Sequence, residues 1–163
     1  MRIASLPTFL AALTLSVNAS AGEMIFDDTG AASLELDAWN SASVGMGVFG
    51  PGWQQAVQTG ATAGTPTGGG TSWVYSGTLA IPGTAGAQLQ YTQNVTVQSA
   101  TTVALHYDFS YASVPASTTI EALHVTTALP VAVFAGKSVM IEGKATPLEL
   151  PLDYGSTMLY SGS

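Results

Sequence analysis

The chain has 163 residues, of which ten are acidic and only three are Lys or Arg, giving a net charge of −7. A surface this acidic repels phosphate groups, so the composition argues against a nucleic-acid partner and against binding to an anionic membrane. Cys is absent and only 8% of residues are charged, while the apolar fraction of 47% is ordinary, so a hydrophobic core must hold any folded domain together.

The N-terminal segment has the pattern of a signal peptide. Arg2 precedes an apolar run at residues 9–17, and Ala19-Ser20-Ala21 supplies the small residues of a cleavage site. That run of about nine residues is far short of the roughly twenty that span a bilayer, so no membrane insertion is expected. We therefore expect residues 1–21 to be removed and the protein to be secreted, periplasmic or held at the cell surface. Residues 22–163 would then form a single β-sandwich domain, either complete or a fragment of a longer protein.

Two short strands are predicted next, at residues 24–26 and 33–36, around a turn that contains Asp27 and Asp28. With the nearby acids these two carboxylates could hold Ca²⁺, which prefers carboxylate and carbonyl oxygens. An Asx turn, in which the Asp side chain accepts bonds from the following backbone amides, explains the same residues without a metal. No cofactor other than this Ca²⁺ is predicted.

Residues 38–107 contain no Asp, Glu, Lys or Arg. Within this run, residues 43–49 predict a strand that ends at a Gly-Pro-Gly turn, and Trp53 follows the turn. Trp53 could thus stand on a loop, where an exposed indole can stack on the apolar face of a sugar ring, or it could belong to the core, as most Trp residues do. Residues 60–70 are expected to form a surface loop, and the alternation at residues 73–79 predicts another strand.

The most regular pattern lies between residues 88 and 111, where odd positions are mostly apolar and even positions are polar. This period predicts two strands of a hairpin, and residues opposite each other in an antiparallel pair lie on the same face. A three-residue loop therefore predicts the pairs Val97 with Val103, Val95 with Leu105, and Tyr91 with Phe109. Three aromatic residues at inward positions are expected in the core: Trp73, Tyr107 and Tyr111.

The even-numbered face of the same hairpin is a candidate binding surface formed by Gln90, Thr92, Asn94, His106 and Asp108. His106 should lie opposite Asn94, and Asp108 opposite Thr92. A His and an Asp two residues apart on one strand could orient each other for proton transfer or supply two metal ligands. A solvated, hydrogen-bonded patch is the simpler interpretation, because the chain has no Gly-x-Ser-x-Gly elbow that would supply a nucleophile. We predict ligand contacts here and no catalytic residue.

The last third of the chain predicts a second hairpin between residues 131–134 and 138–141, then a sheet-edge segment at 148–152 with prolines beside it. Residues 120–125 fit either a helix or a strand. Many short strands and no helix of normal length predict an all-β fold, an antiparallel two-sheet β-sandwich. Residues 158–160 resemble the start of a further strand, so a sandwich that is incomplete at its C-terminus and a complete one both stay open.

Three segments of this pattern resemble a known group of domains. They are similar to the N-terminal β-sandwich regions, of the galactose-mutarotase-like supersandwich type, of secreted bacterial carbohydrate-active proteins. The resemblance covers about residues 23–160 and concerns the strand pattern: FGPGW at 49–53, VYSGTL at 74–79 and LQYTQNV at 89–95. It implies a sandwich that supports or precedes a catalytic domain, and no catalytic residue of such proteins maps onto this chain.

Together these observations predict a secreted, non-catalytic β-sandwich module associated with glycan binding or processing. It would contact neutral polysaccharide through Trp53 or through the polar face between Gln90 and Asp108. The alternative is a surface adhesin or envelope structural subunit, completed at an open sheet edge by a partner strand or an adjoining domain. A small stand-alone hydrolase is a third hypothesis.

Overall fold

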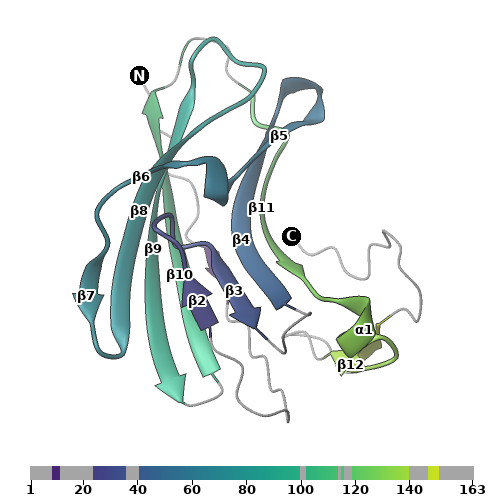
Figure 1. Ribbon diagram of the computed structural model, residues 1–163. Helices are drawn as coiled ribbons and strands as arrows, with labels where there is room; N and C mark the ends of the chain where they lie inside the picture. The colour runs from purple at the N-terminus through teal and green to yellow at the C-terminus, as the bar shows by residue number, and fades with distance from the viewer. Residues whose placement is uncertain are drawn as a thin grey trace.

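The computed structural model describes residues 9–11, 24–35, 41–99, 102–113, 115, 119–139 and 147–150. Two antiparallel sheets face each other and are not joined into a closed barrel (Figure 1). The predicted class, an all-β two-sheet sandwich, is therefore confirmed. The predicted extra strand at the C-terminus falls on residues 158–160, which lie outside the described residues.

The first sheet, sheet A, is dominated by three long strands that follow one another in the chain. Its order is β1-β10-β9-β8-β6, and β7 also pairs with β8. The strands are β1 (Phe9–Ala11), β6 (Thr62–Ala63), β7 (Thr67–Gly69), β8 (Ser72–Ala80), β9 (Gln88–Ser99) and β10 (Thr102–Ser113).

The second sheet, sheet B, is organised around β4. Strand β11 pairs with one side of β4, while β3 and β5 pair with different halves of the other side. The strands are β2 (Met24–Phe26), β3 (Ala32–Glu35), β4 (Ser41–Gly50), β5 (Gln54–Val57) and β11 (Ala122–Ala128), and the short 3₁₀ helices η1 (Pro51–Trp53) and η2 (Gln58–Gly60) flank β5. On that side of β4, β3 pairs with residues up to Val44 and β5 pairs with residues from Gly47 onward. Sheet B therefore has a gap beside Gly45 and Met46.

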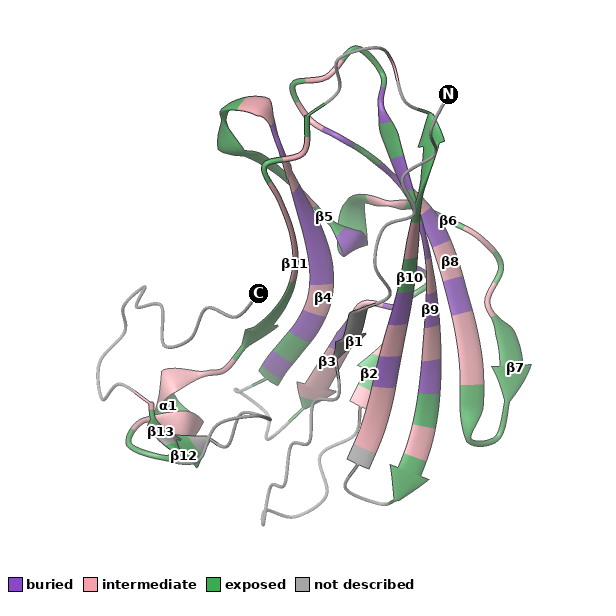
Figure 2. Ribbon diagram, turned by 180° about the vertical axis from the view of Figure 1, so that it is seen from behind, coloured by how far each residue is buried: buried purple, intermediate pink, exposed green. Residues whose placement is uncertain are grey.

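The predicted β9–β10 hairpin is confirmed in its register. Val97 lies opposite Val103, Val95 opposite Leu105, and Tyr91 opposite Phe109. Figure 2 shows how buried and more exposed positions alternate along β8, β9 and β10. The core between the sheets is mainly apolar, and its most completely enclosed apolar or aromatic members are Met46, Val48, Leu79, Leu89, Tyr91, Val95 and Tyr107.

The three aromatic residues predicted for the core differ in their burial. Tyr107 is fully buried, and Trp73 is half-buried and packs against the core. The prediction for Tyr111 is wrong, because this residue is 37% exposed. Residues 110–113 of β10 are all exposed, and among the described strands only Leu105–Tyr107 of β10 are covered by β1. Tyr111 therefore lies on the open edge of sheet A, although Leu89 opposite it in β9 is buried.

Two predictions on the connecting segments need correction. Residues 60–70 are not a loop throughout, because β6 and β7 both pair with β8. Gly68 and Gly70 have φ values of 119° and 65°, which glycine adopts without steric cost and which the tight turn from β7 to β8 requires. The ambiguous segment at 120–125 contributes to a strand, since β11 pairs with β4 over its whole length.

The predicted hairpin between residues 131–134 and 138–141 is wrong. Residues Val131–Phe134 form a single helical turn, α1, and β12 (Ser138–Val139) pairs instead with β13 (Leu148–Glu149). The carbonyl of Pro130 accepts the amide hydrogens of Val133 and Phe134, so this segment satisfies its backbone locally and does not form a ladder. The edge segment predicted at 148–152 is represented by β13, and residues 151 and 152 lie outside the described residues.

Strand β1 comes from the segment that the sequence predicts to be a signal peptide. Phe9, Leu10 and Ala11 pair with Tyr107, His106 and Leu105 at the edge of β10. The other residues of 1–21 lie outside the described part of the chain, and removal of the segment stays a prediction. Among the described segments, none is a helix long and apolar enough to cross a membrane.

Candidate functional site

Trp53 is held away from the core by an unusual backbone conformation. It ends η1, directly after β4, and its φ of 57° is the only positive value at a non-glycine residue among those described. A bulky residue in this region is a steric outlier. The side chain is 64% exposed, so of the two alternatives left open for Trp53, an exposed ring and a core residue, the structure shows the exposed ring.

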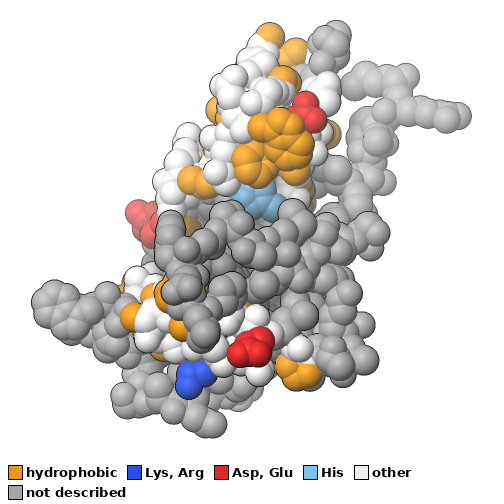
Figure 3. All heavy atoms as spheres, turned by 90° about the vertical axis from the view of Figure 1, so that its right-hand side faces the viewer, with side chains coloured by type: hydrophobic (Ala, Val, Ile, Leu, Met, Phe, Trp, Pro, Cys, Tyr) orange, Lys and Arg blue, Asp and Glu red, His pale blue; other side chains and the backbone are white. Residues whose placement is uncertain are grey.

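Two further rings extend the indole into a continuous surface. The ring of Phe49 lies 5.5 Å from that of Trp53, and on its other side 5.0 Å from that of His124, measured between centroids. Figure 3 faces this side of the molecule and shows hydrophobic side chains gathered around a histidine. We call Trp53, Phe49 and His124 the aromatic platform.

The strand sequence explains how the His124 ring fits there. His124 lies opposite Gly47 in the β4–β11 pair, on the outer face of sheet B. A Cβ atom at Gly47 would lie 2.7 Å from Cε1 and Nε2 of His124, which is too close for a side chain to coexist with the ring. Glycine at position 47 therefore allows the imidazole to pack directly against the backbone of β4, beside Phe49.

His124 is a neutral part of the platform. The side-chain amide of Gln55 lies 3.2 Å from Nε2 of His124, and an amide N–H can only donate, so that ring nitrogen is the acceptor. Burial lowers the pKa of His124 below its usual value, because a desolvated imidazolium is disfavoured. Protonation would also place a hydrogen on Nε2. That nitrogen would then be a donor facing the donor of the Gln55 amide, and their hydrogen bond would be lost.

This arrangement predicts a loss of stability on mild acidification. The unfolded chain takes up a proton on His124 near pH 6.5, whereas the folded chain resists protonation to lower pH, so acid favours unfolding. The free energy of unfolding should therefore fall between about pH 7.5 and about pH 5.5, as measured by urea denaturation, and His124→Gln should flatten that dependence. An identical pH dependence in His124→Gln and the parent protein would contradict this assignment.

The polar face predicted on the hairpin is present, but it lies on the other sheet. His106 is opposite Asn94 and Asp108 is opposite Thr92, as predicted, and Gln90 continues the row on β9. Nε2 of His106 and Oδ1 of Asp108 are 3.4 Å apart, with side chains 33% and 53% exposed. A contact this exposed contributes little to stability, and the face offers amides, hydroxyls, one imidazole and one carboxylate to solvent or to a ligand.

The six residues predicted to bind a ligand thus divide into two separate surfaces. Gln90, Thr92, Asn94, His106 and Asp108 share the outer face of sheet A, whereas Trp53 projects from the end of β4 in sheet B. The sequence analysis did not identify Phe49, Gln55 and His124 as neighbours of Trp53. Phe49 and Gln55 meet through the short β4–β5 connection, whereas His124 is brought to them by the pairing of β4 with β11, which joins segments far apart in the chain.

The acidic turn between β2 and β3 is an Asx turn. Oδ1 of Asp27 accepts the amide hydrogens of Thr29 and Ala31 at 2.8 and 3.1 Å and also the hydroxyl of Thr29. Asp28 is exposed. Within the described ranges, no group of three or more His, Cys, Asp or Glu residues is placed to hold a metal ion, and Ca²⁺ binding by Asp27 and Asp28 stays a prediction.

A polar network that the sequence analysis missed crosses the core next to this turn. Gln58, in η2, and Gln93, in β9, are 1% and 0% exposed. Nε2 of Gln58 donates to Oε1 of Gln93 at 2.8 Å and to the carbonyl of Thr29 at 2.7 Å. Its Oε1 accepts the amide hydrogen of Met46 at 3.0 Å and the hydroxyl of Tyr107 at 3.1 Å.

Gln58 thereby compensates for the gap in sheet B. The amide of Met46 faces the place where neither β3 nor β5 pairs with β4, and the Gln58 side chain accepts the bond that a strand would have accepted. Tyr91 adds to the network by donating its hydroxyl to the carbonyl of Thr29 at 2.8 Å. Burial raises the pKa of Tyr107 far above its usual value, so its hydroxyl stays protonated and remains a donor.

In comparisons with known proteins, no protein-family model, curated protein sequence or solved structure matches the chain.

Proposed function

We propose that this protein is a secreted, non-catalytic β-sandwich module that binds neutral polysaccharide through the aromatic platform. The observation that carries the proposal is the exposed indole of Trp53, which is kept outward at a backbone φ of 57°. Such a conformation costs a non-glycine residue about 1–2 kcal/mol. Strain of this kind is retained where the position of a side chain serves a function.

The chemistry around Trp53 favours an uncharged, hydroxyl-rich ligand. Indole and phenyl rings present apolar faces that match the C–H faces of sugar rings. The amide of Gln55, which is opposite Phe49 in the β4–β5 pair, offers hydrogen bonds to hydroxyl groups on the same face. The platform and this amide, apart from His124, belong to the run of residues 38–107 that carries no acidic or basic side chain. His124 itself is kept neutral at physiological pH by its burial.

The test is affinity electrophoresis through gels that contain different neutral polysaccharides. Retardation of the parent protein should be lost in Trp53→Ala, with at least a tenfold rise in Kd, equivalent to about 1.4 kcal/mol. The matched control is Tyr111→Ala, which removes an exposed aromatic ring from sheet A and should leave retardation unchanged. Equal retardation of Trp53→Ala and the parent would contradict the proposal.

A second candidate function is favoured by strand β1. Its residues belong to the predicted signal peptide, and they pair with Leu105–Tyr107 at the edge of β10. If the segment is removed, that edge offers unpaired backbone groups to a partner strand, as in an adhesin or envelope subunit. Concentration-dependent assembly of the processed chain, without retardation by any polysaccharide, would favour this second function over the first.

A further inference from the structure

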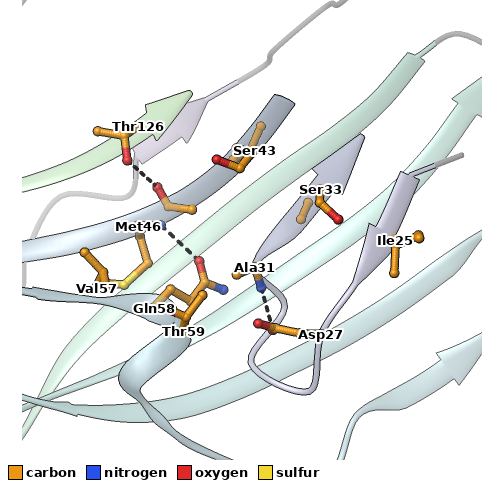
Figure 4. Close-up of a pocket in the computed structure, with 13 residues that line it drawn as sticks. Ile25, Asp27, Ala31, Ser33, Ser43, Met46, Val57, Gln58, Thr59 and Thr126 are labelled. Carbon is orange, nitrogen blue, oxygen red and sulfur yellow. Dashed lines mark hydrogen bonds between the residues drawn. The ribbon is translucent and has the colours of Figure 1, made fainter. Parts of the chain in front are cut away.

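A pocket opens on sheet B where β4 lacks a strand partner. It has a volume of about 380 Å³ and lies between β3, β4 and the β5–η2 segment, with Thr126 of β11 on its rim. Ligand pockets in proteins begin at roughly this size. Figure 4 shows its polar side chains, including Ser33, Ser43 and Thr126, and the hydrogen bond that the amide of Met46 donates to Oε1 of Gln58.

The pocket and the aromatic platform lie on the same face of β4. Outward positions of this strand alternate with the buried residues Val44, Met46 and Val48. In order along the strand they are Ser43 and Gly45, which line the pocket, then Gly47 beneath His124, then Phe49 in the platform. Val57, which is opposite Gly47 and 43% exposed, lines the pocket on the side nearer to His124.

The lining of the pocket has the same neutral character as the platform. Its polar groups are mainly the hydroxyls of Ser33, Ser43, Thr59 and Thr126, set among apolar side chains. The one charged residue of the lining is Asp27, whose Oδ1 is committed to the Asx turn. Gln58 uses both polar atoms within the core network, so it forms the floor of the pocket. The hydroxyl of Thr126 donates to the carbonyl of Gly45 at 3.3 Å and can still accept a hydrogen bond from a ligand, as can the hydroxyls of Ser33, Ser43 and Thr59.

From this continuity we infer that the pocket is a second subsite for the same ligand, a neutral polysaccharide chain that runs along β4 from Trp53 to Ser43. The inference rests on the proposed function and adds the course and minimum length of the ligand. Phe49 and Ser43 are six positions apart on an extended strand, which corresponds to roughly 20 Å. A single sugar ring reaches one of the two subsites, and only a chain of several rings reaches both.

Gly45 provides a way to block the pocket without disturbing the platform. A Cβ atom on Gly45 would lie 3.7 Å from Oε1 of Gln58 and 3.9 Å from Cβ of Ala31, both of which line the pocket. These are ordinary contact distances, so Gly45→Leu should fold while its side chain occupies the pocket. Gly69→Leu is the matched control, because a Cβ atom there meets nothing within 4 Å and the residue is exposed in β7.

The experiment measures the affinity for oligosaccharides of graded length, prepared from a neutral polysaccharide that retards the parent protein. For the parent and for Gly69→Leu, affinity should rise with length until both subsites are filled. Gly45→Leu should bind the shortest oligosaccharides like the parent but bind the longest at least tenfold more weakly, a loss of about 1.4 kcal/mol. A double variant, Ser43→Ala with Thr126→Ala, removes two hydroxyls without adding volume and should show the same selective loss.

The outcomes separate the inference from the function on which it rests. If folded Gly45→Leu and the double variant bind long oligosaccharides as tightly as the parent, the pocket is no subsite, while a loss of binding in Trp53→Ala would still support the proposed function. If Trp53→Ala binds every length like the parent, the proposed function is wrong and the second subsite is overturned with it. Thermal unfolding of each variant confirms that the protein is folded, and should Gly45→Leu fail to fold, the double variant decides.

Discussion

Replacing Gln58 by Ala should lower the free energy of unfolding by about 4 kcal/mol or more, because several buried polar groups lose their partners and each such loss costs about 1–3 kcal/mol. The orphaned groups would be the amide of Met46, the hydroxyl of Tyr107 and Oε1 of Gln93. The carbonyl of Thr29 would keep its bond from the hydroxyl of Tyr91. Urea denaturation at neutral pH measures the change.

Gln58→Leu separates the hydrogen bonds from the packing. Leu fills nearly the same volume as Gln, so it leaves no large cavity but removes all four hydrogen bonds, and most of the destabilisation should remain. Gln90→Ala is the control for loss of an exposed amide and should change stability by less than about 0.5 kcal/mol. A Gln58→Leu variant within about 1 kcal/mol of the parent would show that the network contributes little.

Replacing Gly30 by Ala should destabilise the protein by about 3 kcal/mol, through backbone strain and overpacking together. Gly30 closes the Asx turn with a φ of 82°. A Cβ atom there would overlap Oε1 of Gln93 and lie 2.8 Å from Cβ and Cγ of Tyr75, so the turn and the core network would have to separate. Thermal and urea unfolding both measure this effect.

Gly86→Ala isolates the backbone contribution to that loss. Gly86 has a φ of 85°, but a Cβ atom on it meets nothing within 4 Å, so this variant should cost only about 1 kcal/mol. The difference between the two variants then measures how tightly the acidic turn is packed on Tyr75 and Gln93. Equal losses in both variants would mean that the contact with the core adds nothing.

The alternation of apolar odd positions with polar even positions was sufficient to predict the β9–β10 pair. Placing apolar residues such as Val95 and Leu105 on one face fixes the register, because a slip by one residue would turn each of them to solvent. The same argument does not locate the end of the core, which explains the wrong prediction for Tyr111. Leu89, opposite Tyr111 in β9, is buried, whereas Tyr111 lies on the outer strand, and the order of strands in a sheet leaves no mark on the alternation of side chains.

Local bonding accounts for the other wrong predictions. Residues 131–134 have β-branched side chains that fit a strand, but Pro130 accepts two amide hydrogens and closes a helical turn. The glycine-rich residues 60–70 are too poor in apolar side chains to predict strands, yet β6 and β7 pair with β8 through their backbones. Backbone pairing of this kind leaves little trace in the order of side-chain types.

The candidate site was only partly predictable for a related reason. The position of Trp53 after a Gly-Pro-Gly turn made exposure one of two open interpretations, and Phe49 and Gln55 are near it in sequence. His124, the third member of the group, comes from β11, which is distant in sequence. A signal for the buried network was present, since Gln93 occupies an inward odd position between Tyr91 and Val95. Its partner Gln58 lies in a 3₁₀ turn without periodicity, so only the folded chain brings the two together.

The lack of formal charge on the strands from β4 to β9 has a consequence for the surroundings in which the protein works. Dissolved ions weaken attraction between charged groups by screening it, but they leave ring stacking and contacts between hydroxyl groups largely unchanged. Adhesion through the outer face of β4 would therefore be nearly independent of ionic strength. Such a surface would hold its ligand as firmly in brine as in fresh water.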